Sequence, residues 1–394
     1  MKTHLKPIVI IGTGLAGYTL VRELRKLDAS QPIVMITEDD GCFYSKPILS
    51  NALSQQKSPD RLVQSSASEM AEKHQLNILT NTKVVELMPG SHEIVLHTGE
   101  RIEYQQLVLA TGARPRQLPA SIYADVELPE HSIFSINSLD HYKAFYQRLS
   151  DVEHVCIVGA GLIGCEFAND LLAAGKRVSV VSNTPLPLNG VIPSAMSEAL
   201  LDELKSLGMQ WYGETSVQSI HTLASGGLQL KLNQQKIEAD LVLSAIGLEV
   251  DLSLAAQAKL DVTDGIVTDG FLQTSVADVY AIGDCAAVCG VNQKYIMPIM
   301  HAARSLANTL VTDQPSKVNY PEMPIMVKTP AYPIVFTANN QSASVTERIE
   351  AADNGSALRV LYYNANNSLT GFALSGELTK ERQALLKQIE TDKA

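Results

Sequence analysis

The chain of 394 residues contains one local pattern twice, and this repeat limits the folds that it can adopt. In each copy a run of mostly β-branched apolar residues leads into a Gly-x-Gly-x-x-Gly loop and then into a helical segment. Such apolar runs are typical of strands buried on both faces of a parallel sheet. The runs lie at 7–11 and 154–158, followed by Gly12-Thr13-Gly14-Leu15-Ala16-Gly17 and Gly159-Ala160-Gly161-Leu162-Ile163-Gly164.

The residues around each loop predict the rest of a nucleotide-binding unit. We expect helices at 18–27 and 166–174, with Gly175 at the position after a helix where glycine is common. Further strands are expected at 33–36 and 178–181. Each copy then closes with a buried strand that stops at a tight turn, at Ala110-Thr111-Gly112 in the first and at Gly247 in the second.

The spacing of the loop glycines predicts two dinucleotide sites. The first glycine permits the turn, the second lets backbone approach a pyrophosphate, and the third lets helix and strand pack closely. Glu38 follows the second strand and can accept ribose hydroxyls, a role that Asp39 or Asp40 could share. In the second copy Ser182-Asn183-Thr184 stands there instead. This neutral stretch leaves NAD and NADP open, and the absence of a basic residue favours NAD.

Composition excludes several other classes of protein. A net charge of −11 argues against a nucleic-acid surface, which needs clustered Lys and Arg. Five cysteines, an odd number in largely apolar surroundings, indicate a reduced chain rather than a disulfide framework. The pair Cys285 and Cys289 has no neighbouring ligand set, so we expect no metal site. No uninterrupted apolar run is long enough for a membrane span, so we expect a soluble, cytoplasmic protein. The short last domain shows no large apolar face in its sequence, so we expect a monomer.

The last part of the chain has a different composition. A strand ending at Gly283-Asp284 is followed by a predicted helix at 298–311. Beyond residue 316, prolines separate short strand-like pieces at 325–328, 334–337 and 358–363, and a last helix is expected at 380–389. This pattern predicts a small α+β domain.

The two loops, the Ala110-Thr111-Gly112 turn and the Gly283-Asp284 turn together resemble the FAD-dependent pyridine nucleotide oxidoreductases, the superfamily that includes glutathione reductase. The resemblance covers residues 7–316 or so. It implies an α/β fold with two Rossmann-like domains and a small C-terminal α+β domain. FAD would bind the first loop and Asp284, and NAD the second loop. The implied domains are 1–114 with 250–316 for FAD, 115–249 inserted for NAD, and 317–394 covering the flavin and facing a partner.

The segment after Asp40 indicates to which branch of this superfamily the chain is similar. Disulfide reductases carry two cysteines here, whereas Cys42-Phe43-Tyr44-Ser45-Lys46-Pro47 has one. Cys42 could be the thiol of a single-cysteine NADH oxidase or peroxidase, and this stays an alternative. The run Ser45-Lys46-Pro47-Ile48-Leu49-Ser50 resembles reductases of small iron proteins. With the short last domain, the 164–170 run and the 327–331 run, the chain resembles the rubredoxin reductases of alkane-hydroxylating bacteria.

This resemblance implies roles for single residues. Lys46 would lie near the flavin N5 and pair with Glu166, and both would be catalytic. Thr37 and Glu38 would contact the adenosine ribose, Val84 the adenine, and Ile296 and Lys328 the flavin. Without the resemblance, Lys46 and Lys328 are typical of surface lysines, and Glu166 of an acid in the first turn of a helix. The remaining implied cofactor contacts are Gly12 to Gly17, Ala110 to Gly112, Gly159, Gly161 to Gly164, Gly247, Gly283 and Asp284.

The implied activity is electron transfer from NADH through FAD to rubredoxin, in two one-electron steps, for a membrane alkane hydroxylase. The chain encodes no iron site of its own, so the acceptor would be a separate protein. A ferredoxin reductase is the second alternative. A nucleotide-sensing flavin-binding protein without catalysis is the third.

Overall fold

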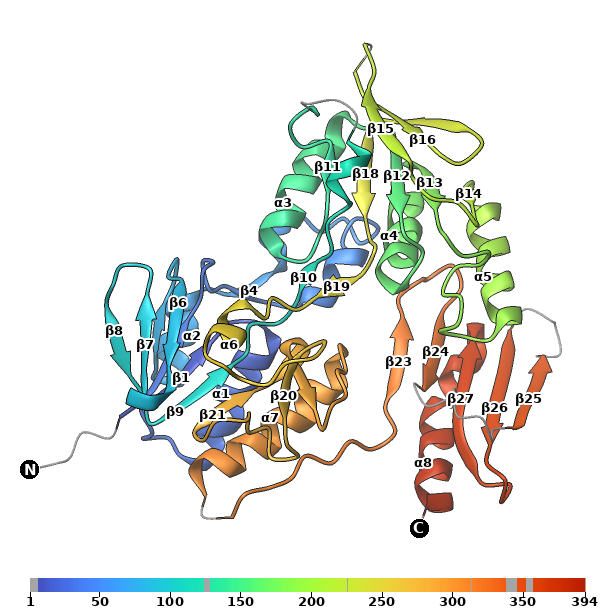
Figure 1. The fold of residues 1–394 in the computed structure, drawn as a ribbon. Coiled ribbons are helices and arrows are strands. Elements are labelled where there is room, and N and C mark those ends of the chain that lie inside the picture. The colour runs from blue at the N-terminus through green and yellow to red at the C-terminus, as the bar shows by residue number, and fades with distance from the viewer. Residues whose placement is uncertain are drawn as a thin grey trace, which may run out of the picture. The chain divides into compact units, whose positions relative to one another are not determined.

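A computed structural model gives the fold of the chain (Figure 1) and describes residues 6–123, 128–224, 226–312, 314–337, 346–351 and 357–393. The chain divides into two compact units. The first unit comprises Met1–Ser45, Asp60–Arg114 and Leu248–Pro321, and the second comprises Lys46–Pro59, Pro115–Gly247 and Glu322–Ala394. Each unit is built from segments that are far apart in the sequence.

The first unit is organised around a five-stranded parallel sheet in the order β21-β9-β1-β2-β5. These strands are β1 (Ile8–Ile11), β2 (Ile33–Ile36), β5 (Asn77–Leu79), β9 (Gln106–Leu109) and β21 (Val279–Ala281). Two long helices, α1 (Leu15–Leu27) and α7 (Ile296–Val311), pack against one another in this unit. Its other helices are α2 (Ala67–His74) and α6 (Ser253–Gln257).

Short ribbons complete the first unit. An antiparallel sheet in the order β6-β7-β8 is formed by β6 (Val84–Met88), β7 (Glu93–Leu96) and β8 (Arg101–Glu103). Two smaller pairs join β3 (Phe43–Tyr44) with β4 (Val63–Ser65) and β20 (Ile266–Thr268) with β22 (Ala286–Val288). Short 3-10 helices lie at Pro89–Ser91 and Gly283–Cys285, another spans Pro59–Leu62, and β10 (Arg114–Pro115) and β19 (Leu248–Glu249) are two-residue strands.

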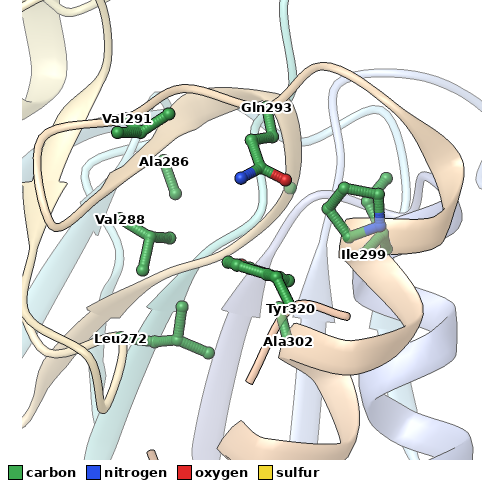
Figure 2. A pocket seen from close by; sticks show the side chains of 10 residues that line it. Leu272, Ala286, Val288, Val291, Gln293, Ile299, Ala302 and Tyr320 are labelled. Carbon is green, nitrogen blue, oxygen red and sulfur yellow. The ribbon is translucent and has the colours of Figure 1, made fainter. Parts of the chain in front are cut away.

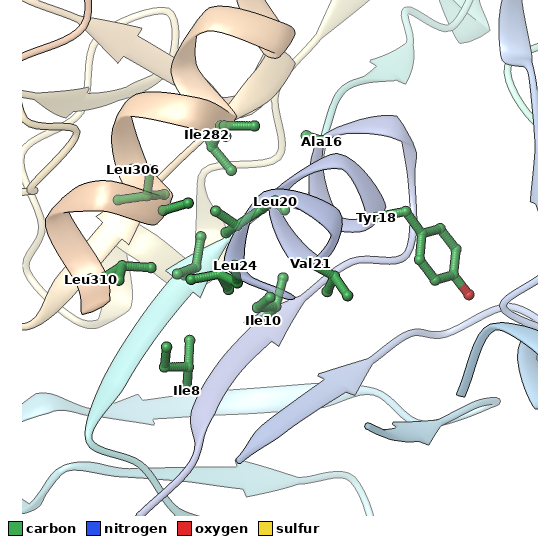
Figure 3. Close-up of a cluster of buried hydrophobic side chains, with 14 of the residues drawn as sticks. Ile8, Ile10, Ala16, Tyr18, Leu20, Val21, Leu24, Ile282, Leu306 and Leu310 are labelled. Atoms are coloured by element: carbon green, nitrogen blue, oxygen red, sulfur yellow. The ribbon is translucent and has the colours of Figure 1, made fainter. Parts of the chain in front are cut away.

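The core of the first unit follows from the alternation of side chains along β1. Ile8 and Ile10 belong to the cluster formed with α1 and α7, whereas Val9 and Ile11 belong to a cluster with the β6-β7-β8 ribbon. Successive side chains of a strand point to opposite faces of its sheet, so both faces of β1 are covered. Figure 3 shows the first cluster, in which Leu20 and Leu24 of α1 lie close to the α7 side chains Leu306 and Leu310.

The second unit repeats this architecture with a five-stranded parallel sheet in the order β11-β18-β12-β13-β14. Its strands are β11 (Ile133–Phe134), β12 (His154–Val158), β13 (Arg177–Val181), β14 (Gln210–Tyr212) and β18 (Leu241–Ser244). Its helices are α3 (Leu139–Arg148), α4 (Leu162–Ala173) and α5 (Ser194–Ser206), with 3-10 helices at Lys46–Asn51, Ala120–Ile122 and Leu149–Asp151. An antiparallel ribbon consists of β15 (Ser219–Thr222), β16 (Leu228–Lys231) and β17 (Lys236–Ala239).

The end of the chain forms an antiparallel sheet in the order β23-β24-β27-β26-β25. The strands are β23 (Pro324–Val327), β24 (Ile334–Thr337), β25 (Thr346–Ala351), β26 (Leu358–Tyr363) and β27 (Leu369–Ser375). The 3-10 helix Gly376–Glu381 and helix α8 (Arg382–Lys393) follow. Leu385 and Ile389 of α8 pack on Phe372 and Leu374 of β27, which closes a core for this sheet.

The predicted α/β fold class with its C-terminal α+β part is confirmed. Three predicted helix starts were wrong by two to four positions, because α1, α4 and α7 begin at Leu15, Leu162 and Ile296 rather than at 18, 166 and 298. In α1 and α4 the middle glycine of the loop, Gly14 or Gly161, is itself the N-cap residue, so the helix starts inside the glycine motif. The predicted domain boundaries stay a prediction.

Candidate functional site

The first glycine loop joins β1 to α1 with very little room between them. Gly12 has φ of 115°, and a Cβ there would lie 2.8 Å from the carbonyl carbon of Ala110. A Cβ on Gly17 would overlap the carbonyl oxygen of Gly12. By contrast, no described atom lies within 4 Å of a Cβ built on Gly14. The loop therefore packs tightly on the protein side and leaves open space beside the helix N-terminus, as a pyrophosphate requires.

The second loop has the same construction in the second unit. Gly159 has φ of 107°, and a Cβ there would lie 2.5 Å from Ala245 O. A Cβ on Gly164 would overlap Gly159 O, whereas one on Gly161 meets no described atom within 4 Å. Leu162 and the residues after it form the first turn of α4. Both loops thus fit the dinucleotide phosphates that the sequence predicted.

The predicted ribose residues of the first unit lie at the end of β2. Thr37 Oγ1 donates to Asp39 Oδ1 at 2.5 Å, and Thr13 Oγ1 donates to the same oxygen at 3.3 Å. Asp39 therefore links the first glycine loop, through Thr13, to the end of β2, through Thr37. Glu38 is exposed, with an ion pair to Lys83 at 3.6 Å. All three acids considered at this position are exposed, but Asp39 and Asp40 accept hydrogen bonds within the turn, whereas Glu38 pairs with Lys83.

The other predicted contacts of the first unit lie at or near strand ends. Val84 is the first residue of β6, and Ala110 to Gly112 follow β9. Gly283 has φ of 81°, and a Cβ there would lie 2.8 Å from Ala16 Cβ, so the segment after β21 approaches the first loop. Asp284 follows it, and its carbonyl accepts from Asn292 Nδ2 at 3.1 Å.

A pocket in the first unit is bordered by these segments (Figure 2). Gly283 and Ala286 line it from the segment after β21, and Pro298 and Ile299 line it from the first turns of α7. Tyr320 also lines it. The predicted contact residue Ile296 is the first residue of α7, two positions before Pro298. The structure therefore brings the Gly283-Asp284 turn and the N-terminal end of α7 to one place.

In the second unit a polar cluster forms around Glu166, whose side chain is 7% exposed. Glu166 Oε2 accepts from Ser50 Oγ at 2.5 Å and from the Lys328 ammonium group. Its other oxygen accepts from the main-chain N–H of Lys328 at 2.9 Å. The Lys328 Nζ also donates to Pro47 O at 2.7 Å. One buried carboxylate thus holds two segments that are distant in the sequence.

Glu166 forms an ion pair that the sequence analysis did not predict, and the predicted pairing with Lys46 stays a prediction. Lys328 supplies its ammonium group, whereas Lys46 Nζ lies 3.4 Å from Asn137 Oδ1. Both lysines lie on segments that approach α4 or α3, so a pattern of residue types could not tell which of them reaches the carboxylate. Gly247, the remaining predicted contact of this unit, follows β18 with φ of 104°.

Two further polar residues of α4 were missed by the sequence analysis. Asp170 is fully buried and accepts from the N–H groups of Leu53 and Ser54 at 3.0 and 2.8 Å. Asn169 Oδ1 accepts from the N–H of Ala331 at 3.1 Å. Burial raises the pKa of the Asp170 carboxyl, although its hydrogen bonds oppose this. Adjacent Asn and Asp in an otherwise apolar helix were the available signal, because buried polar groups need partners.

The cysteines differ in their surroundings. Burial raises the pKa of the Cys156 and Cys165 thiols to about 12, and it also raises that of Cys285. Cys42 is partly exposed and Cys289 exposed. Among the described residues, no group of three or more His, Cys, Asp or Glu side chains could hold a metal ion. In the same part of the chain, no helix is long and apolar enough to cross a membrane.

Two known protein families match the sequence of this chain. The profile described as pyridine nucleotide-disulphide oxidoreductase matches residues 6–305. The chain belongs to this family. A second profile, described as the rubredoxin binding C-terminal domain, matches residues 317–389. The second match covers the antiparallel sheet and most of α8.

Individual relatives agree over nearly the full length. The chain is 39% identical to the rubredoxin-NAD(+) reductase of Acinetobacter baylyi, covering 98% of both chains. It is 36% identical to the nitric oxide reductase FlRd-NAD(+) reductase of Klebsiella pneumoniae, covering 97% of this chain and 98% of the relative. Among solved structures, the putidaredoxin reductase–putidaredoxin complex matches with a TM-score of 0.88 at 21% identity, covering 98% of this chain and 93% of that chain. At 21% identity this structural match supports the assignment of the fold alone.

Proposed function

We propose that this chain is a rubredoxin–NAD(+) reductase, an FAD-containing enzyme that takes electrons from NADH and passes them to rubredoxin. The match of residues 317–389 to a rubredoxin-binding domain carries the proposal. Full-length similarity to a rubredoxin-NAD(+) reductase supports it. Two glycine loops of the dinucleotide-binding type support the use of two nucleotides.

We propose the following division of the chain. An FAD-binding domain comprises 1–114 and 250–316, an NAD-binding domain comprises 115–249, and a partner-binding domain comprises 317–394. FAD would be held by Gly12 to Gly17, Thr37, Glu38, Lys46, Val84, Ala110 to Gly112, Gly283, Asp284, Ile296 and Lys328. NADH would be held by Gly159, Gly161 to Gly164, Glu166 and Gly247.

FAD, when bound, supplies the chemistry of accepting a hydride from NADH and releasing single electrons. The chain contributes binding and electrostatics. The open side of each glycine loop admits a pyrophosphate, and the amide groups at the start of α1 and α4 face negative charge. Lys46 adds a positive charge that would stabilise a developing anion. Glu166, Ser50 and Asp170 hold the segment that carries Lys46 against α4.

A steady-state assay tests the activity. Purified, FAD-loaded protein should oxidise NADH rapidly only when oxidised rubredoxin is present, and reduced rubredoxin should accumulate. Because six of the relatives at 34–36% identity are named nitric oxide reductase FlRd-NAD(+) reductases, the FlRd partner is the second acceptor to test. No acceleration by rubredoxin would refute the proposal.

Two variants separate the proposal from its alternatives. Lys46→Ala should lower the rate of hydride uptake or raise the KM for NADH if its charge acts as proposed. Cys42→Ser should leave rubredoxin reduction unchanged, whereas a single-cysteine oxidase or peroxidase would lose its oxygen- or peroxide-dependent turnover. Ferredoxin in place of rubredoxin tests the ferredoxin reductase alternative.

The wider setting is also part of the proposal. We propose that the reduced rubredoxin serves an alkane hydroxylase, and that the reductase works in the cytoplasm as a monomer. Loss of growth on alkanes after deletion of the gene, with growth on fatty acids retained, would support the first point. Sedimentation of the FAD-loaded protein and fractionation of cells test the other two.

A further inference from the structure

The two units share one pattern of main-chain hydrogen bonds beside their second strands. In the first unit the N–H groups of Thr37, Asn81 and Thr82 donate to the carbonyls of Leu79, Asp39 and Thr37, at 3.0, 2.9 and 2.8 Å. In the second unit the N–H groups of Ser182, Glu214 and Thr215 donate to the carbonyls of Tyr212, Thr184 and Ser182, at 2.9, 3.1 and 2.9 Å. The loop after the second strand and the loop after the third are thus tied together in the same way in both units.

These bonds fix which residues of the two units correspond. Thr37 corresponds to Ser182, so the next residue, Glu38, corresponds to Asn183. Asn81 corresponds to Glu214, and both adopt the left-handed conformation, with φ of 51° and 53°. The amide and the carboxylate have therefore exchanged places. The first unit has the acid on the loop after β2, and the second has it on the loop after β14.

Glu214 is also the only charged residue of these two loops, since residues 181–188 and 211–217 contain no other Asp, Glu, Lys or Arg. Its side chain is exposed. An acid at this edge of a Rossmann sheet favours a ribose with free hydroxyls, whereas a basic residue is needed to accept a 2′-phosphate. A 2′-phosphate would carry nearly two negative charges toward the loop that bears Glu214.

We propose that Glu214 is the residue that makes the second nucleotide site select NADH over NADPH. It supplies the negative charge that Asn183 does not, and it repels the 2′-phosphate. This inference rests on the proposed use of the second loop for the nicotinamide nucleotide. The place of Glu214 at the same site as Asn183 follows from the hydrogen-bond register, because the two residues are 31 positions apart in the sequence.

The first experiment removes this charge without changing the shape of the side chain. NAD+, NADP+ and 2′,5′-ADP are titrated into the FAD-loaded Glu214→Gln protein and the wild type by calorimetry. For charges about 5–8 Å apart in a solvated site, the variant should bind NADP+ and 2′,5′-ADP about three- to tenfold more tightly. NAD+ affinity should stay within about twofold, and the gain should shrink between about 20 mM and about 300 mM salt as screening increases.

The matched control is Glu198→Gln, which removes an exposed acid of α5 that belongs to neither loop of the same unit. It should leave all three affinities unchanged. Unchanged NADP+ affinity in Glu214→Gln, or an equal gain in both variants, would overturn the inference. Because binding is measured without rubredoxin, failure of electron transfer would refute the proposed function and leave this result intact.

A second variant tests the correspondence itself. Asn183→Glu places a carboxylate where the first unit has Glu38. When combined with Glu214→Gln, it should restore the wild-type preference for NAD+ over NADP+, because the acid returns to the same edge from the neighbouring loop. A double variant that keeps the relaxed NADP+ affinity of Glu214→Gln would show that the two positions do not face one ribose site, and the inference would fall.

Discussion

Replacing Lys328 with methionine would remove the ammonium group that pairs with the buried Glu166 carboxylate and leave two neutral donors to it. In the wild type, Glu166 accepts from Ser50 Oγ, from the main-chain N–H of Lys328 and from the Lys328 ammonium group. The Glu166 side chain is 7% exposed and that of Lys328 is 32% exposed. The variant therefore keeps the hydrogen bonds from Ser50 Oγ and from the main-chain N–H, but it removes the ammonium donor and the charge that balances the carboxylate.

The expected loss of folding stability in Lys328→Met follows from these contacts. Removing one partner of a fully buried pair costs about 3–5 kcal/mol. Two donors to Glu166 remain, and the Lys328 side chain is 32% exposed, so we expect a loss of about 2 kcal/mol. For a domain of about 150–250 residues this corresponds to a fall in Tm of about 4–8 °C.

A double-mutant cycle measures the coupling energy between Lys328 and Glu166. Thermal unfolding of the FAD-loaded wild type, Lys328→Met, Glu166→Gln and the double variant should give a coupling energy of about 1–2 kcal/mol. Lys143→Met is the control, because Lys143 forms a more exposed ion pair with Asp140 in the same unit at 3.4 Å. Its effect should be smaller, as exposed pairs contribute about 0–1 kcal/mol. Additive single effects, or equal shifts for Lys328→Met and Lys143→Met, would refute the reasoning.

The remaining predictions concern α4 and the thiols. Asp170→Asn should lower stability by about 1–3 kcal/mol, because a group that accepts two buried N–H bonds is changed. Burial raises the pKa of Asp170, so the folded protein binds this proton more tightly than the unfolded chain. Wild-type stability should therefore decline as pH rises from the usual carboxyl pKa up through the raised pKa of folded Asp170, and denaturant titrations of Asp170→Asn should lack that part of the decline. Gly164→Ala should abolish NAD+ binding while FAD stays bound, since its Cβ would overlap Gly159 O, whereas Gly161→Ala should keep the unfolding temperature of the wild type in thermal scans. Thiol alkylation near neutral pH, read by mass spectrometry, should modify Cys42 and Cys289 in the native protein, and Cys156, Cys165 and Cys285 only after unfolding. Labelling of Cys156 at the native rate would contradict the burial on which this rests.

Strands with a clean apolar pattern could be predicted from the sequence to the residue. The predicted strands at 33–36, 334–337 and 358–363 coincide with β2, β24 and β26. Strand β27 was not predicted, because Gly371 in its middle weakens the local preference for a strand. The structure explains this glycine, since a Cβ there would lie 2.6 Å from Thr337 Oγ1 on the neighbouring strand.

Some features of the candidate site could also be predicted from the sequence, and others could not. The glycine loops were predictable because each loop is continuous in the sequence and its geometry demands glycine. The contacts of Ser50 and Asp170 were not, because each joins segments 116 or more residues apart. The ion pair of Glu166 with Lys328 was not predicted for this reason: helical spacing identifies a buried acid, but it does not show which distant lysine the fold brings to it.

The junction at α4 has a consequence for how the chain matures on the ribosome. Residues 50–54 are synthesised more than a hundred residues before the helix that binds them, and Lys328 follows Glu166 by a further 162 residues. Closing such long loops is slow, and exposed intermediates of large proteins aggregate. We therefore expect nascent chains that stop before residue 328 to be captured by chaperones or degraded, because Glu166 of α4 then lacks the Lys328 ammonium group with which it pairs.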